Sequence, residues 1–193
     1  MTARATGKAA ALSARERLLA SADELFYNEG VHSVGIDRVI EHAGVAKASL
    51  YRLFGSKEEL IAAYLGARHE RTLAELRATA ESFPDPRDGM LAVFDVQARR
   101  LRRRGYRGCA FARASAERSA GGQVQRATRA YRTAIHGLFE DLALQAGVRD
   151  PGLLAAQLHT LYHGADVVVG SGTMRTRLID ATRAAAQTLI AVA

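Results

Sequence analysis

The fold is decided by residues 30–60, GVHSVGIDRVIEHAGVAKASLYRLFGSKEEL. Apolar residues recur there at helical spacing in two short segments, the first of which stops at Gly44. In the second segment, about 46–54, Leu50 and Phe54 share one side and polar residues occupy the other. Helices this short cannot be stable alone, so both must pack against neighbours. An apolar back, a glycine-containing turn and a polar front indicate a helix-turn-helix whose second helix is presented outward, as the major groove of DNA requires.

The whole chain has the size and composition of a globular protein. Its 193 residues, 48% of them hydrophobic, suit one domain or a small head with a larger body. No apolar run reaches the ~20 residues of a membrane span, and the first twelve residues lack the apolar block of a signal peptide. The single cysteine, Cys109, fits a reducing compartment. We therefore expect a cytoplasmic protein without membrane attachment.

The charge of the chain is basic but unevenly distributed. A formal net charge of +7 suits a polyanionic partner. Residues 1–57, however, hold eight basic and six acidic side chains, a surplus of only two. Much of the excess lies in the arginine run, Arg99, Arg100, Arg102, Arg103, Arg104 and Arg107. Such a run is usually a solvated helix end, and gripping flanking DNA or an acidic ligand is the alternative. Bulk charge therefore supports DNA binding only weakly.

Helical patterns cover nearly all of the chain. S-x-x-E capping boxes begin helices at Ser13 and Ser56, and Asp-Pro pairs begin others at Asp85 and Asp150. No stretch shows convincing strand alternation, so the predicted fold class is all-α with about nine helices. The predicted helices cover about 13–28, 36–43, 46–54, 57–80, 86 to Gly105 or Gly108, 111–119, 123–145, 151–169 and 174–192.

Residues 13–60 resemble the DNA-binding head of the tetracycline-repressor (TetR) family. The resemblance rests on Leu25-Phe26, Gly30, Ile36-Asp37-Arg38-Val39-Ile40, Ala43-Gly44-Val45, Leu50-Tyr51, Phe54 and Ser56-Lys57-Glu58-Glu59-Leu60. Residues 61–193 are similar to the family only in plan. Within them, the segment 107–111 resembles one at the start of the sixth helix in part of the family.

The resemblance implies a homodimeric transcriptional regulator, most often a repressor, with no cofactor. Residues 1–12 would be a flexible arm, 13–60 the DNA-binding head and 61–193 the ligand-binding and dimerisation body. The last two helices would pair with those of a second copy. Two heads would bind adjacent major grooves of a palindromic operator, about 34–36 Å apart. A small-molecule ligand would then release the operator.

The exposed side of the second short helix supplies the candidate DNA contacts. A lysine can donate to guanine or phosphate, an alanine can pack on a thymine methyl, and Lys57 would bind phosphate at a helix N-terminus. For each charged residue the alternative is solvated surface. Two departures from the family are Ala46, where a capping Ser or Thr is common, and Leu53, where His or an aromatic is common. The candidates are Arg38, Ala46, Lys47, Ala48, Ser49, Tyr51, Arg52 and Lys57, with Arg4 and Lys8 of the arm as weaker ones.

Three further features concern the body. His159, His163 and Asp166 fall at i, i+4 and i+7, so they would bind a transition metal or, as we favour, form a polar patch in the ligand pocket or dimer seam. Cys109 is either a redox sensor whose thiol pKa is lowered by Arg107 or, as we favour, a buried structural residue. The ligand-binding candidates are the interior side chains Phe94, Phe111, Tyr131 and His163.

No nucleophile elbow, P-loop or dinucleotide motif occurs, so enzyme function is not expected. The predicted function is a ligand-responsive DNA-binding repressor. The alternative is an all-α ligand- or metal-sensing protein whose DNA binding is weak or lost. The sequence leaves open the effector, the operator, the regulated genes and repression versus activation.

Overall fold

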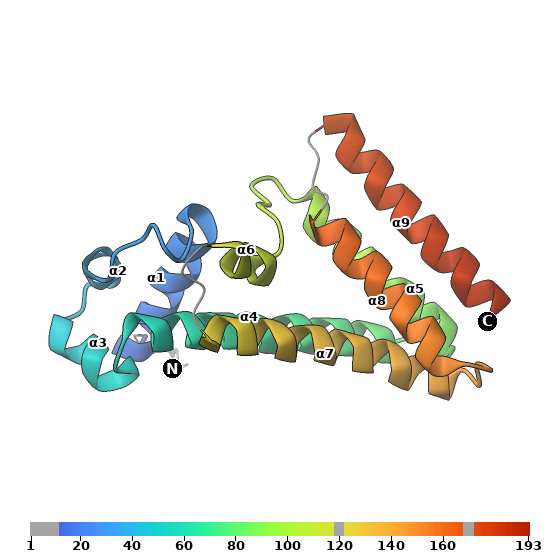
Figure 1. Ribbon diagram of the computed structural model, residues 1–193, viewed down its shortest axis with the longest axis horizontal. Coiled ribbons are helices and arrows are strands. Elements are labelled where there is room, and N and C mark those ends of the chain that lie inside the picture. Colours follow the sequence, from blue (N-terminus) through green and yellow to red (C-terminus); the bar gives the residue numbers. More distant parts are fainter. Residues whose placement is uncertain (1–11, 118–121, 168–171) are drawn as a thin grey trace, which may run out of the picture. The chain divides into compact units, whose positions relative to one another are not determined.

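A computed structural model describes residues 12–117, 122–167 and 172–193, and in these ranges the regular structure is entirely helical (Figure 1). The all-α fold class is confirmed. The helices are α1 (Ala14–Glu29), α2 (Ile36–Ala43), α3 (Lys47–Phe54), α4 (Lys57–Glu81), α5 (Pro86–Arg102), α6 (Ala110–Ala116), α7 (Gly122–Gln145), α8 (Pro151–Val167) and α9 (Gly172–Val192).

Helix ends differ from the prediction at two described places. Helix α5 ends at Arg102 because Arg103 is extended, and the left-handed Gly105 and Gly108 lie in the following loop. Helix α9 begins at Gly172, two residues before the predicted start. The predicted arm contacts Arg4 and Lys8, and the predicted ends of α6 at 119 and α8 at 169, lie outside the described residues.

The predicted helix starts are confirmed by their hydrogen bonds. The Ser13 amide donates to the Glu16 carboxylate at 2.7 Å and the Glu16 amide donates back to the Ser13 hydroxyl at 3.2 Å, a complete capping box. Asp85 accepts from the Arg87 amide at 2.8 Å at the start of α5. Asp150 accepts from an amide at 3.0 Å at the start of α8. Such caps are worth ~1 kcal/mol each because they satisfy amides that the helix leaves without partners.

The chain forms two compact units, residues 1–61 and 62–193. In the first, α1 packs against α2 and α3 around a shared apolar core. Its members recur at helical spacing, and each fully buried large side chain contributes ~1.5–3 kcal/mol. They include Leu18, Ala22, Leu25 and Phe26 from α1, Val39 and Ile40 from α2, Leu50 and Phe54 from α3, and Leu60 from α4.

In the second unit, α7 packs on α8, while α9 packs on both α5 and α8 (Figure 1). The core includes Phe94, Ile135, Phe139, Leu158 and Tyr162. Glycine is required at Gly89, where an added Cβ would lie 2.8 Å from the backbone oxygen of Ala80. This close approach lets the end of α4 and the start of α5 meet.

Ion pairs join α5 to α9 along the surface of the second unit. Asp95 accepts from Arg183 at 2.6 Å, and Arg102 donates to Asp180 at 2.7 Å. Half-exposed pairs of this kind contribute at most ~1 kcal/mol each, so they set the register of the two helices more than their stability. Among the described helices, none combines the length and apolar character needed to cross a bilayer.

Candidate nucleic-acid interface and ligand region

The turn between α2 and α3 is built on Gly44. Its backbone is left-handed, with φ 61° and ψ 43°, a conformation that costs other residues roughly 1–2 kcal/mol. Its amide donates to the Glu41 carbonyl at 3.0 Å, and the Val45 amide donates to Ile40 at 3.3 Å, which closes α2. From α1, the Arg17 guanidinium donates to the Gly44 carbonyl at 3.2 Å. Sequence reasoning missed Arg17, because nothing local links it to a turn 27 residues away.

The turn fixes which side of α3 faces solvent. Leu50 is fully buried and Phe54 is also buried, so this side packs against the other helices of the unit. The predicted DNA contacts Lys47, Ala48, Tyr51 and Arg52 are all exposed, as is Ala46 before the helix, whereas Ser49 is half-buried. Tyr51 leaves 46% of its surface exposed. The exposed side of α3 therefore offers two cations, a phenol and a methyl group together.

Lys47 already has an intramolecular partner in this state. Its Nζ lies 2.7 Å from the Asp37 carboxylate, and this hydrogen bond raises the pKa of Lys47. Both side chains are more than half exposed, so the pair is solvated and weak. Lys47 can exchange Asp37 for a phosphate or a guanine edge. No local pattern in the sequence predicts this pairing across the turn.

Arg38 and Lys57 are held more firmly than the sequence suggested. The Arg38 guanidinium binds both carboxylate oxygens of Glu29, one of them at 2.9 Å. Lys57 is half-buried, and its Nζ donates to the His32 carbonyl at 3.4 Å. At the start of α4, the Ser56 hydroxyl accepts from the Glu59 amide at 3.1 Å. The other amides of a first helical turn have no partner within the helix. These amides can donate hydrogen bonds to a phosphate oxygen.

The two departures from the family pattern have visible structural results. Ala46 occupies the N-cap of α3, where no side-chain hydrogen bond is made. The Ser49 amide instead donates to the Ala46 carbonyl at 2.9 Å. Leu53 is half-buried, which suits packing rather than contact with a base.

The four ligand-binding candidates lie in one aromatic cluster of the second unit. Phe111 of α6 stacks on Tyr131 of α7 with ring centroids 4.1 Å apart and an interplanar angle of 4°. The Tyr131 ring also meets His163 edge-on at 5.8 Å. Phe94 stacks on Phe139 at 5.5 Å and meets Tyr162 at 6.2 Å. Burial and the neighbouring Tyr162 raise the pKa of Tyr131 well above its usual range, so its hydroxyl stays protonated.

His159, His163 and Asp166, for which a metal site was the alternative to a polar patch, do not come together as one group. The histidine rings adjoin at 4.5 Å, but the buried Asp166 accepts from Gln97 at 3.2 Å and from the Tyr106 hydroxyl at 3.1 Å. In the part of the chain that the structure describes, no three histidine, cysteine or acidic side chains are grouped to hold a metal ion. A shared helix face does not bring the three side chains to one ion, because Gln97 of α5 and Tyr106 of the loop before α6 donate hydrogen bonds to the carboxylate of Asp166.

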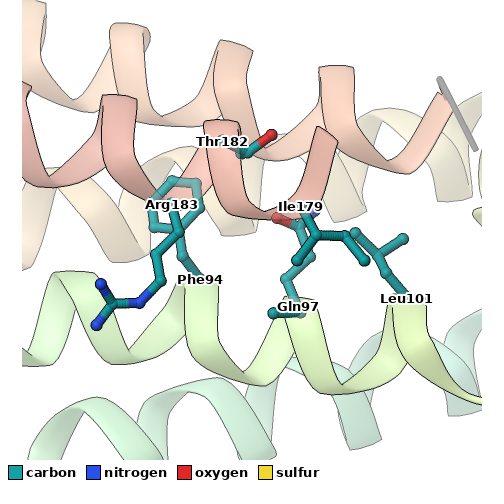
Figure 2. A pocket seen from close by; sticks show the side chains of 7 residues that line it. Phe94, Gln97, Leu101, Ile179, Thr182 and Arg183 are labelled. Atoms are coloured by element: carbon teal, nitrogen blue, oxygen red, sulfur yellow. The ribbon is translucent and has the colours of Figure 1, made fainter. Parts of the chain in front are cut away.

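A shallow hollow lies between α5 and α9, with about 160 Å³ of empty space that is partly open to solvent. Figure 2 shows Phe94, Gln97 and Leu101 pointing from α5 towards α9. Ile179 and Arg183 approach from α9. The hollow touches the aromatic cluster only through Phe94.

A comparison with known proteins identifies the family. The profile described as "Bacterial regulatory proteins, tetR family" matches residues 18–64. The crystal structure of a TetR-family transcriptional regulator from Streptomyces coelicolor matches with a TM-score of 0.83 at 32% identity, covering 92% of this chain and 94% of that one. This chain belongs to the TetR family of transcriptional regulators.

Other relatives match over less of their length or at lower identity. The HTH-type transcriptional activator FasR of Mycolicibacterium smegmatis is 33% identical over 82 residues, which cover 42% of this chain and 37% of that protein. The chain spans less than half the length of the curated relatives that it matches. The TetR-family regulator CifR, solved with 26-base-pair operator DNA, has a TM-score of 0.75 at 20% identity, covering 95% of this chain and 98% of that one. At that identity the likeness concerns the fold alone.

Cys109 of this TetR-family chain does not have the properties of a redox sensor. Burial, followed by the charge of Asp166, raises the pKa of the Cys109 thiol to about 11. Because the thiolate is the reactive form, the thiol is almost entirely unreactive at neutral pH. The redox-sensor alternative required Arg107 to lower this pKa, but burial raises it instead. The half-buried Cys109 instead forms the N-cap position of α6.

Proposed function

We propose that this TetR-family regulator is a repressor that binds a palindromic operator as a homodimer and leaves it when a small molecule binds. The observation that supports DNA contact by α3 is its exposed polar side. The buried opposite side of α3 and the hydrogen bond from Arg17 to Gly44 fix the orientation of that exposed side. In this proposal residues 13–60 form the DNA-binding domain and residues 61–193 bind ligand and dimerise. The protein would act in the cytoplasm, where operator DNA is found.

The proposed contacts divide into two kinds. Lys47, Ala48 and Arg52 would read base edges in the major groove, with Ala46 and Ser49 beside them. Tyr51, Lys57 and Arg38 would bind phosphates and set the register. Arg38 must first release Glu29, so its contribution would be smaller than that of Lys57. CifR bound to operator DNA supports this use of the fold.

Exposed apolar residues on α8 and α9 support dimerisation through these helices. Leu153 and Val167 of α8 expose 55% and 67% of their surface, and Met174 and Val192 of α9 expose 58% and 79%. A symmetric pairing of α8 and α9 with those of a second copy would remove these side chains from water. Two joined heads would also offset the modest charge of each head.

The proposed effector site is the aromatic cluster that contains Phe94, Phe111, Tyr131 and His163. These side chains come from α5, α6, α7 and α8, so a ligand among them would touch four helices of the second unit. A change in the packing of these helices would be the step that alters DNA affinity.

One binding experiment tests the proposal. Fluorescence anisotropy of labelled DNA from beside the protein's own gene should show saturable binding. Competitor DNA of unrelated sequence should not remove this binding, and rising salt should weaken it steeply. Absence of sequence-specific binding would favour the alternative of a ligand sensor without DNA function. Because FasR is named an activator, a reporter assay with and without the protein must decide the direction of control.

A further inference from the structure

We propose that the effector of this regulator is a planar aromatic molecule bearing a hydroxyl group, which enters between Phe111 and Tyr131 and hydrogen-bonds to His163. This inference rests on the proposed function, because it names the chemistry of the molecule that would occupy the proposed effector site. Three observations support it: the geometry of one ring pair, an imidazole nitrogen without a partner, and the state of the surrounding charges.

The first observation is the parallel stack of Phe111 and Tyr131. Their centroids lie 4.1 Å apart at an angle of 4°, so the two rings are parallel and stacked. Parallel stacking leaves each ring face suited to another flat ring, because aromatic faces pack well on one another. A flat ring inserted between them would keep both faces covered. A saturated ring would present hydrogens above and below its mean plane and would force the stack further apart.

The second observation is the position of His163 at the edge of this stack. Its ring meets Tyr131 at 5.8 Å and Tyr162 at 5.5 Å, both nearly perpendicular. The His163 Nε2 atom is buried and has no hydrogen-bond partner in the described part of the chain. A buried polar atom without a protein partner is costly, so a group that hydrogen-bonds to it on binding gains stability. A ligand hydroxyl can donate to a bare Nε2, which an ether oxygen cannot do.

The third observation is that Asp166 and Arg100 already have partners and that His163 is uncharged. Asp166 is held by Gln97 and Tyr106, and Arg100 donates to the Glu75 carboxylate. Burial, with help from His159 and Arg132, lowers the pKa of His163 to about 4, so this imidazole is neutral at pH 7. A neutral imidazole nitrogen suits a hydroxyl group as its hydrogen-bond partner.

The route into the stack is through α6. This helix has seven residues and packs on α7, with a hydroxyl contact of 2.8 Å between Ser115 and Thr128. It follows a loop that contains the left-handed Gly105 and Gly108. A displacement of α6 by about 3.5–4.0 Å, the separation of carbon atoms in contact, would admit one aromatic ring. The rest of the core need not move.

The experiment is calorimetric titration of the full chain, without DNA, using three probes. 2-Naphthol is planar and has a hydroxyl, 2-methoxynaphthalene is planar but cannot donate, and decahydro-2-naphthol has the hydroxyl but is not planar. We expect one 2-naphthol per chain, bound at least tenfold more tightly than either other probe. Equal affinity for all three, or no binding of 2-naphthol, would overturn the inference.

Variants test the two residues separately. His163→Phe keeps an aromatic ring and should weaken 2-naphthol tenfold or more while leaving 2-methoxynaphthalene unchanged. Phe111→Leu should weaken both planar probes. His32→Phe and Phe83→Leu, at exposed positions, serve as matched controls. If His163→Phe does not fold, as judged by its melting curve, His163→Leu replaces it, and unchanged 2-naphthol affinity in a folded variant contradicts the inference.

Operator release is measured on a separate sample, which distinguishes the two proposals. Loss of DNA binding by the unliganded protein would refute the proposed function but not the binding of 2-naphthol to the stack. If 2-naphthol binds the protein while operator affinity stays unchanged, the assignment of this class as effector is refuted.

Discussion

The Arg17 guanidinium on α1 donates a hydrogen bond of 3.2 Å to the carbonyl of Gly44, the residue that turns the chain between α2 and α3. The bond joins the first helix of the unit to the turn that aims the recognition helix. It uses a carbonyl that α2 leaves without an intrahelical partner. A side chain distant in sequence thereby helps set the direction of the proposed DNA-reading surface.

Arg17→Ala should therefore weaken operator binding more than it weakens folding. Because the bond is exposed, we expect a loss of at most about 1 kcal/mol in the free energy of unfolding. Operator affinity should fall by about three- to tenfold, since a shifted recognition helix misaligns several contacts at once. Anisotropy titration and urea unfolding measure the two effects. Arg77→Ala, at an exposed position on α4, is the control. Equal operator affinities for the two variants would mean that Arg17 does not orient the recognition helix.

Ala46→Ser should stabilise the start of α3. The N-cap of this helix makes no side-chain hydrogen bond, and a serine there typically adds ~1 kcal/mol. Thermal unfolding should show a higher midpoint for Ala46→Ser than for the wild type, and Ala78→Ser, at an exposed position in the last turn of α4, should show none of this gain. A midpoint at or below that of the control would mean that the N-cap is already satisfied by other groups.

Lys57→Ala should weaken binding to all DNA sequences alike. If Lys57 neutralises one phosphate, the slope of log K against log salt should decrease in magnitude by ~0.9 per head. Arg38→Ala should change the slope less, because Arg38 is already paired with Glu29. Measurements between low and high salt on operator and random DNA would show this. An unchanged slope for Lys57→Ala would assign Lys57 to structure through its bond to His32.

Asp166 and His163 should oppose each other in the pH dependence of stability. Burial raises the pKa of Asp166 from 3.8 to about 6. Ionising this buried carboxyl therefore lowers the stability of the fold, an effect that is absent below pH 4 and fully present above pH 6. Burial lowers the pKa of His163 from 6.5 to about 4, so its cost appears as pH falls from 6.5 to 4. Each effect is on the order of 3 kcal/mol at 1.36 kcal/mol per pKa unit. In the wild type they largely cancel.

Single variants would separate the two effects. Relative to wild type, Asp166→Asn should lose stability on acidification from pH 6.5 to 4, because only the histidine term remains. His163→Phe should gain stability over the same range. Urea unfolding at four or five pH values measures both, with the exposed Asp141→Asn as control. Parallel pH curves for Asp166→Asn and the control would mean that Asp166 titrates normally.

The sequence was sufficient for the parts of the fold that local chemistry controls. Capping residues such as Ser13 and Asp85, and the glycine at Gly44, determine where helices begin and end within a few residues. Apolar spacing likewise predicted that Leu50 and Phe54 would be buried, and the structure confirms it.

What the sequence could not supply was pairing between distant side chains. Lys47 with Asp37, and Arg17 with Gly44, depend on how helices cross after folding. Asp166 shows the same limit: its spacing from the histidines predicted one helix face, yet Gln97 and Tyr106 draw its carboxylate into a separate buried network. Burial likewise raises the pKa of Cys109, whereas the redox-sensor alternative required Arg107 to lower it.

The central claim is that the exposed side of α3 binds operator DNA. The most direct measurement compares wild-type protein and Arg52→Ala on operator and random DNA by fluorescence anisotropy at one fixed salt concentration. We predict that Arg52→Ala lowers operator affinity at least tenfold, about 1.4 kcal/mol, and lowers random-DNA affinity much less. Equal operator affinity for the two proteins would contradict the claim that this side of α3 reads DNA.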